Sequence, residues 1–345
     1  LADLTESELS DVSGEGIALV FEDFQIDMKG EVMGGEVGND FQVTGIKDHA
    51  GAVVNVGIGQ FYLSGTGSNL GDNLGGRLVN LGRLNNPITI DVLDGNSLSA
   101  GSGSWADKSV LAIAMPTHIA TGYNCTDANA TAGSGTCSSR PHDVDPDGFH
   151  GERFDMGFRI NRQFSDSTKD VNLNFHAQSA NMDGSYLRLW GSDDSDVDDH
   201  AMKMEIQMNF YASKLVFNSC NLDGKSCGEQ VGFDNFSMEL ALGDAKFFQP
   251  MTLDATDEGF LHIEIQALPS PGDPRVPKAG SGAIATDGKL AGSDADSWNW
   301  YNDYYANGRK TNISISNLTV GTESFGSSSL TNLQIQYLEI TTHDL

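Results

Sequence analysis

The residues best placed to bind a ligand lie in the acidic segment DVDPDG, where aspartates alternate with other residues and Gly148 follows. Carboxylates at this spacing can surround one calcium ion, and a glycine allows the sharp turn that such a loop needs. The candidate ligands are Asp143, Asp145, Asp147, the carbonyl of Phe149, and Glu152, with Asp155 as the alternative to Glu152. An EF-hand is excluded, because Phe154 stands where its last glutamate would be. A solvated acidic loop is the competing interpretation.

A run of aromatic residues is the second candidate for ligand binding. Its members are Trp298, Trp300, Tyr301, Tyr304 and Tyr305, interleaved with aspartates. Aromatic faces beside carboxylates can stack on sugar rings and hydrogen-bond their hydroxyls. The same residue types are enriched in subunit interfaces. A third interpretation is that the run packs onto its own domain.

The common catalytic signatures are absent from the sequence. It has no HExxH, no GxSxG, no Walker A motif and no GxGxxG after a predicted strand. No two of the eight histidines lie two or four positions apart. Paired carboxylates of the glycosidase type cannot be singled out among 48 acidic residues. We therefore expect a protein that is not an enzyme.

The charge balance excludes two classes of partner. The chain of 345 residues carries 48 acidic side chains against 20 lysines and arginines, a net charge of −28. Such a surface repels nucleic-acid phosphates and anionic membranes. No apolar run approaches the roughly 18 residues of a membrane helix. We expect no nucleic-acid partner and no membrane insertion.

The four cysteines form two local pairs. Each pair brackets a turn-like stretch rich in glycine, asparagine or aspartate, which favours the disulfides Cys125–Cys137 and Cys220–Cys227. A zinc site is the weaker alternative, because neither pair is CxxC. Disulfides imply export, with a signal peptide already removed.

Alternating apolar and polar residues predict an all-β fold. Segments such as 52–65, 170–178, 185–191 and 202–217 alternate as half-buried strands do. Turn residues between such segments favour a β-sandwich or a jelly-roll-like domain. We expect a single large β domain over residues 17–345, interrupted by long loop insertions at 117–155 and 269–308.

The first 28 residues predict a short helix followed by a strand. Thr5 and Glu8 form a capping box, and a helix with its linker over residues 1–16 ends near Gly14. The residues expected to contact a neighbouring subunit or sheet are Leu4, Leu9, Val12, Ile17, Leu19, Phe21, Phe24 and Ile26. Pairing of this strand within its own sheet is the alternative.

Three segments carry a family resemblance. The opening LTESELSDVSGEGI, the central DGSYLRLWGSDD and the closing LQIQYLEITTHDL resemble FilA-type pilus-system proteins, which are secreted surface proteins of Gram-negative bacteria. Glu15 stands where that group usually has glutamine. The resemblance implies a surface or filament role and supplies no catalytic residues.

We therefore expect a structural subunit of an extracellular filament, pilus or surface layer that binds copies of itself. Such subunits join by adding a terminal strand, here 17–28 or 330–342, to an open sheet edge. The alternative is a calcium-dependent carbohydrate-binding or adhesive module, with a glycan or surface receptor as its partner.

Overall fold

The computed structural model describes most of the predicted strands and one segment predicted as loop. The described residues are 16–24, 26–27, 32–33, 36–37, 41–47, 51–65, 82–99, 102–115, 153–164, 171–191, 201–220, 227–256, 259–269 and 295–342. Residues 1–15 of the predicted helix and linker, and most of the insertion at 117–155, lie outside them.

Strands make up 66% of the described structure and helices are few, which confirms the all-β prediction. They are β1 (Ile17–Phe24), β2 (Ile26–Asp27), β3 (Val32–Met33), β4 (Glu36–Val37), β5 (Phe41–Lys47), β6 (Val53–Ser64), β7 (Gly82–Asp94), β8 (Ser109–Ala114), β9 (Phe154–Phe164), β10 (Val171–Ala180), β11 (Tyr186–Gly191), β12 (Met202–Cys220), β13 (Val231–Leu242), β14 (Met251–Ala255), β15 (Leu261–Ile265), β16 (Thr311–Ile315), β17 (Asn317–Val320), β18 (Glu323–Ser324), β19 (Ser328–Leu333) and β20 (Leu338–Thr341). The helices are α2 (Gly95–Leu98), the 3₁₀ turn η2 (Ala245–Phe247) and α3 (Ala295–Asn307). Helix α3 lies inside the segment predicted as a loop at 269–308.

All described strands except β3 and β4 join in one antiparallel sheet of 18 strands. The long strand β12 is its centre. Along one edge, the first part of β12 pairs with β11 and its last part with β10. Along the other edge, its first residues pair with β14 and the following ones with β13. Beyond β11 follow β8, β7 and β1, and beyond β10 follow β9, β6 and β5. The sandwich or jelly-roll form stays a prediction.

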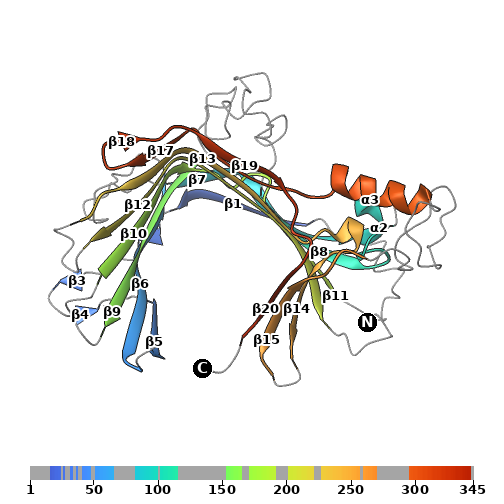
Figure 1. Ribbon diagram of the computed structural model, residues 1–345, viewed down its shortest axis with the longest axis horizontal. Helices are drawn as coiled ribbons and strands as arrows, with labels where there is room; N and C mark the ends of the chain where they lie inside the picture. The colour runs from blue at the N-terminus through green and yellow to red at the C-terminus, as the bar shows by residue number, and fades with distance from the viewer. Residues whose placement is uncertain are drawn as a thin grey trace.

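The sheet is bent into an arch, and β12 crosses the bend (Figure 1). Ser179 on β10 and Asn235 on β13 have positive φ angles of 46° and 49° and lie on either side of β12 near Ser213. The alternation of side chains along β12 changes phase there. The apolar residues of one face are even-numbered from Met202 to Ala212 and odd-numbered at Leu215 and Phe217, so that face stays apolar through the bend, while Tyr211 and Val216 lie on the other face.

Candidate functional site

The registers place apolar residues directly opposite one another from strand to strand. Opposite residues of an antiparallel pair share one face of the sheet. One row crosses β1, β7, β8, β11, β12 and β13: Ile17, Ile90, Ile113, Leu187, Ile206 and Leu242. A second row crosses β7, β8, β11, β12, β14, β15 and β20: Val92, Leu111, Leu189, Met204, Met251, Ile265 and Leu338. One face of this half of the arch is therefore aliphatic from edge to edge.

Phenylalanines continue this face into the other half of the arch. Phe175 on β10 lies between Phe158 on β9 and Phe217 on β12, with ring centroids 4.7 Å and 5.1 Å away. The row goes on to Val231 on β13 and Val320 on β17. These rings pack around the buried Ala177, Ala180, Ala212 and Leu215. We call the whole apolar surface the inner face.

The inner face is the concave side of the arch. The opposite face holds η2 and α3, because Ala245 of η2 donates its backbone N–H to Glu205 and Phe247 packs on α3. Figure 1 shows α2, α3 and η2 on the outer side of the bend. Members of the inner face reach the solvent despite their apolar character: Ile17 is 61% exposed, Val92 57% and Ile340 49%. Other members are covered within the chain: Met204, Met251 and Ile265 are at most 8% exposed and pack with Ile335.

The outer face is polar where the inner face is apolar. The row next to the aliphatic one is Trp190, Lys203, Thr252, Glu264 and Glu339. Lys203 and Thr252 are buried on this side, and Glu264 lies directly opposite Glu339. The sheet is thus amphipathic, and each of its two sides is covered by the chain over part of its area.

Glu205 is the centre of a buried ion cluster on the outer face. It accepts hydrogen bonds from the Tyr186 hydroxyl at 2.9 Å and the Arg188 guanidinium at 3.1 Å, and Arg309 lies 3.7 Å away. Arg309 also donates to the carbonyls of Ile206, Leu242 and Gly243. Burial, reinforced by the charge of Glu205, raises the pKa of Tyr186, so its hydroxyl stays a donor. This cluster attaches η2 and the segment after α3 to the sheet.

Asp244, beside this cluster, gives the fold a pH dependence. Burial raises the pKa of Asp244 to about 6, although the backbone N–H of Arg309 partly offsets this. A raised folded-state pKa stabilises the fold at low pH. The stabilisation by protonated Asp244 is complete below the ordinary pKa of 3.8 and is lost as the pH rises through about 6.

No metal-ligating group of three or more side chains occurs in the described part of the chain.

We expect Asp244→Asn to remove this pH dependence. The free energy of unfolding of the wild type, relative to that of the variant, falls by about 2–3 kcal/mol between pH 4 and pH 7. Urea denaturation across this range measures it. Asp303→Asn is the control with the opposite sign, because a hydrogen bond from Asn307 lowers the pKa of Asp303. If the difference in unfolding free energy between wild type and Asp244→Asn did not change with pH, the raised pKa of Asp244 would be contradicted.

The aromatic run folds onto its own domain. Trp300, Tyr301 and Tyr304 are buried around Phe247, as the third interpretation of the run expects. The hydroxyl of Tyr304 donates to Gln249, and burial raises the pKa of Tyr304 to about 12. Tyr305 remains half exposed. The side chain of Trp298 lies outside the described residues.

The N-terminal strand pairs within its own sheet. Ile17, Leu19 and Phe21 of β1 face β7, and Ile26 on β2 pairs with β6. Phe24 pairs with Gly82. Several predicted residues lie outside the described ones: Leu4, Leu9, Val12, Cys125, Cys137 and the proposed calcium ligands Asp143, Asp145, Asp147, Phe149 and Glu152. The calcium site therefore stays a prediction.

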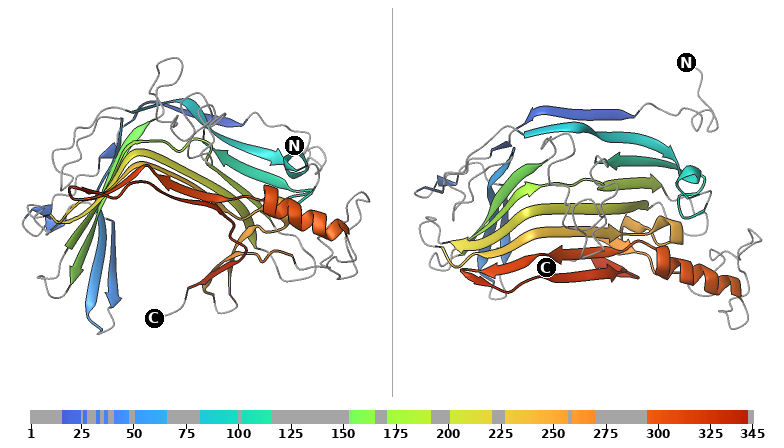
Figure 2. Two further views of the ribbon diagram at one scale, coloured as in Figure 1. Left: turned by 45° about the horizontal axis from the view of Figure 1, so that its top comes forward. Right: turned by 90° about the horizontal axis from the view of Figure 1, so that it is seen from above.

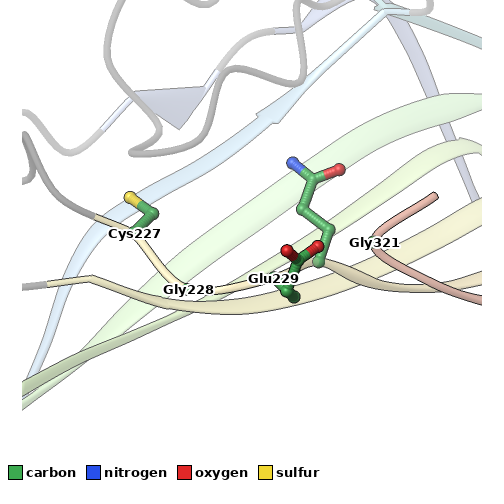
Figure 3. A pocket seen from close by; sticks show the side chains of 5 residues that line it. Cys227, Gly228, Glu229 and Gly321 are labelled. Carbon is green, nitrogen blue, oxygen red and sulfur yellow. The ribbon is translucent and has the colours of Figure 1, made fainter.

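The predicted disulfide between Cys220 and Cys227 is present and joins residues seven positions apart. A shallow depression beside it is lined by Cys227, Gly228, Glu229, Gln230 and Gly321 (Figure 3). The side chain of Glu229 lies so close to Gly321 that a Cβ there would be 1.9 Å from its carboxylate. Glu229 is the one ionisable side chain among these five, so the depression holds no catalytic cluster.

We expect the double variant Cys220→Ser/Cys227→Ser to lose about 2–3 kcal/mol of unfolding free energy, because a loop of this length loses its covalent closure in the unfolded state. The shift of the urea midpoint measures this loss. Ser219→Ala, one position away on β12, is the control and should leave the midpoint within about 0.5 kcal/mol of the wild type. An unchanged midpoint in the double variant would show that the disulfide does not constrain the chain.

Comparison of the chain with protein-family models, curated proteins and solved structures finds no match. Among the described residues, no helix has the length and apolar character to cross a membrane.

The inner face was not among the sites predicted from the sequence. Part of the signal was present, because apolar and polar residues alternate from Met202 to Phe210. Such alternation shows that one side of a strand is apolar, but it does not show whether another layer covers that side.

Proposed function

We propose that the chain is a structural subunit of an extracellular filament or surface layer, in which the sheet of one copy continues into the sheet of the next. The observation that carries this proposal is that two of the described strands with a neighbour on one side only, β1 and β19, lie at opposite borders of the sheet. Figure 2 shows β1 along one border and β16 to β19 along the other.

The first border is β1. Among the strands that the structure describes, β1 pairs with β7 alone. Its residues 17–21 contain no charge and no proline, and Ile17, Val20 and Phe21 are between 45% and 61% exposed. Natural edge strands usually carry lysine, proline or a charge that blocks pairing with another chain. This part of β1 carries none of them.

The second border is β19. Its pairing within the described part of the chain is with β16 alone, and all six of its residues are exposed. The sequence SSLTNL also lacks charge and proline. A row of the inner face, Phe210, Met238, Ile313 and Leu330, ends on this strand. Pairing of β19 with the β1 of another copy would extend the apolar rows from subunit to subunit.

The arrangement refines the expected mode of assembly. Since β1 already pairs with β7, donation of the whole strand to a neighbour would break that pairing. Edge-to-edge addition keeps it and uses only the unpaired side of the strand. The two borders differ, so the contact is head-to-tail, which gives an open chain of subunits when the rotation between copies does not close a ring. The resemblance to secreted pilus-system proteins supports the same role.

The test is the polymeric state of the purified chain. The net charge of −28 opposes association, so the experiment uses at least 0.15 M salt to screen it. We expect the wild type to form concentration-dependent polymers in sedimentation velocity and electron microscopy. Val20→Lys should reduce them at least tenfold. Ser219→Lys changes the charge equally on the interior strand β12 and should not. A monomeric wild type at high concentration would overturn the proposal.

A further inference from the structure

We infer that the junction between copies is antiparallel and has a single register, in which Ile17 of one copy lies opposite Leu330 of the next. This inference rests on the proposed assembly through β1 and β19, and it adds which residues of the two strands meet. Three observations carry it: the directions of the two strands, the regular stretch that each of them offers, and a bulge that ends the regular stretch of β19.

The strand directions follow from the pairings of the sheet. From β1 the sheet passes through β7, β8, β11, β12, β13 and β16 to β19, and each of these seven pairings is antiparallel. An odd number of reversals makes β19 antiparallel to β1 within one copy. A following copy that joins head-to-tail with its inner face on the same side has the same orientation. Its β1 therefore runs antiparallel to the β19 that it meets.

Each border strand offers a regular stretch of the same length. In β1, residues 17–19 pair with β7 in an unbroken register, which shifts between Leu19 and Phe21. In β19, residues 328–330 pair with β16 in an unbroken register, which shifts after Leu330. A backbone ladder is disrupted where the register shifts, so these two stretches are the parts best suited to pair with another chain.

A bulge ends the regular stretch of β19. Between Leu330 and Leu333, β19 holds one residue more than the facing segment of β16. Asn332 within this bulge has a φ angle of 60°, and its backbone N–H donates to the side-chain oxygen of Asn312 at 2.9 Å. That N–H is thus used within the chain. Because bulges at sheet edges terminate pairing, a partner strand is limited to the residues before this one.

The apolar side chains match in the register that superposes the two regular stretches. Ile17 and Leu330 both lie on the inner face and are 61% and 48% exposed. Placing them opposite each other joins the row that ends at Leu330 to the row that begins at Ile17. Both side chains then leave the water, which favours this register.

The neighbouring registers lack this match. A slip by one residue would turn the side chains of one strand to the other face. A slip by two residues in one direction places Ile17 opposite Asn332, inside the bulge. A slip by two in the other direction places Ile17 opposite Ser328 and away from Leu330.

The test is disulfide cross-linking of polymers through cysteines placed on the two borders. Ala18→Cys and Ser329→Cys, combined in one chain, lie opposite each other in the inferred register, and both positions are exposed. Opposite residues of an antiparallel pair have Cα atoms about 4.5–5.5 Å apart, which suits a disulfide. Oxidation of the assembled variant should give a ladder of covalent oligomers on a non-reducing gel. The two strands lie at opposite borders of the sheet, so this link joins different copies (Figure 2).

Two register-shifted variants are the matched controls. Ala18→Cys/Thr331→Cys moves the second cysteine two residues along β19 to a diagonal position, so it should cross-link at least about fivefold more slowly. Ala18→Cys/Ser327→Cys reports the opposite shift in the same way. Sedimentation velocity before oxidation shows whether each variant assembles, and circular dichroism shows whether it folds.

Asn312→Ala tests whether the bulge positions the partner strand. Loss of the side-chain acceptor frees the N–H of Asn332, so the bulge restricts the edge less. Cross-linking of Ala18→Cys/Thr331→Cys relative to Ala18→Cys/Ser329→Cys should then rise at least about threefold. An unchanged ratio in polymers of the folded variant would show that the bulge does not set the register.

The remaining outcomes separate this inference from the proposed function. Faster cross-linking in a shifted pair would overturn the register and leave assembly through β1 and β19 in place. Polymers that cross-link through none of the three cysteine pairs would overturn the junction itself. A chain that stays monomeric at high concentration would overturn the proposed function and the register together.

Discussion

An equimolar mixture of Val20→Lys and Ser329→Lys should form dimers and nothing larger, while each variant alone stays monomeric. Val20→Lys blocks the β1 border but retains an intact β19, and Ser329→Lys does the reverse. One productive border therefore remains in each copy, and the mixture can form a single junction between β19 of one variant and β1 of the other. Lysine on an edge strand blocks pairing because its charge would have to be buried between the two chains.

Sedimentation velocity of the mixture separates the possible kinds of contact. A head-to-tail contact gives the dimer only on mixing. If β1 paired with β1 of another copy, Ser329→Lys would dimerise alone. Each single variant should also cap growing ends of the wild type, so a few per cent of either should shorten the polymers. Polymers of normal length in the equimolar mixture would show that these borders are not the contact.

Replacing Glu205 by alanine should destabilise the fold by about 3 kcal/mol, because it leaves the partly buried Arg188 and Arg309 without their counter-charge. Glu205 is 1% exposed and accepts hydrogen bonds from the Tyr186 hydroxyl, the Arg188 guanidinium and the backbone N–H of Ala245. The loss should release η2 from the outer face together with the segment at Arg309. Urea denaturation and hydrogen exchange of residues 244–248 measure the two effects.

Controls distinguish the charge from the hydrogen bonds of Glu205. Glu205→Gln keeps an acceptor for Tyr186 but removes the charge, so we expect a smaller loss of about 1.5–3 kcal/mol. Glu229→Ala removes an exposed carboxylate and should change stability by no more than about 0.5 kcal/mol. Equal stability of Glu205→Ala and Glu229→Ala would contradict the buried cluster.

Strand patterns and cysteine spacing were enough to predict the fold class and one covalent link. Alternation identified β10, β11 and β12, and the turn-like stretch between Cys220 and Cys227 identified the disulfide. Both are local properties, which a single sequence records directly. Helix α3 was missed, because its aromatic residues Trp300, Tyr301 and Tyr304 were placed in a segment predicted as a long loop. Their burial depends on Phe247, more than 50 positions earlier in the chain.

The inner face and the ion cluster could not be predicted for the same reason. Glu205 meets Arg309 across more than 100 positions of sequence, and the row from Val92 to Leu338 joins strands from both ends of the chain. No local pattern specifies such partners. The bend at Ser179 and Asn235 depends on left-handed backbone conformations that serine and asparagine adopt only in particular surroundings.

The most direct test of the proposed assembly is the structure of the junction between two copies, determined by electron cryo-microscopy of wild-type polymers. We predict that β1 of each copy lies beside β19 of the next at the ordinary spacing of about 4.8 Å, with the apolar rows continuous across the junction. A polymer joined through α3 or the outer face, with β1 and β19 still facing solvent, would contradict the account.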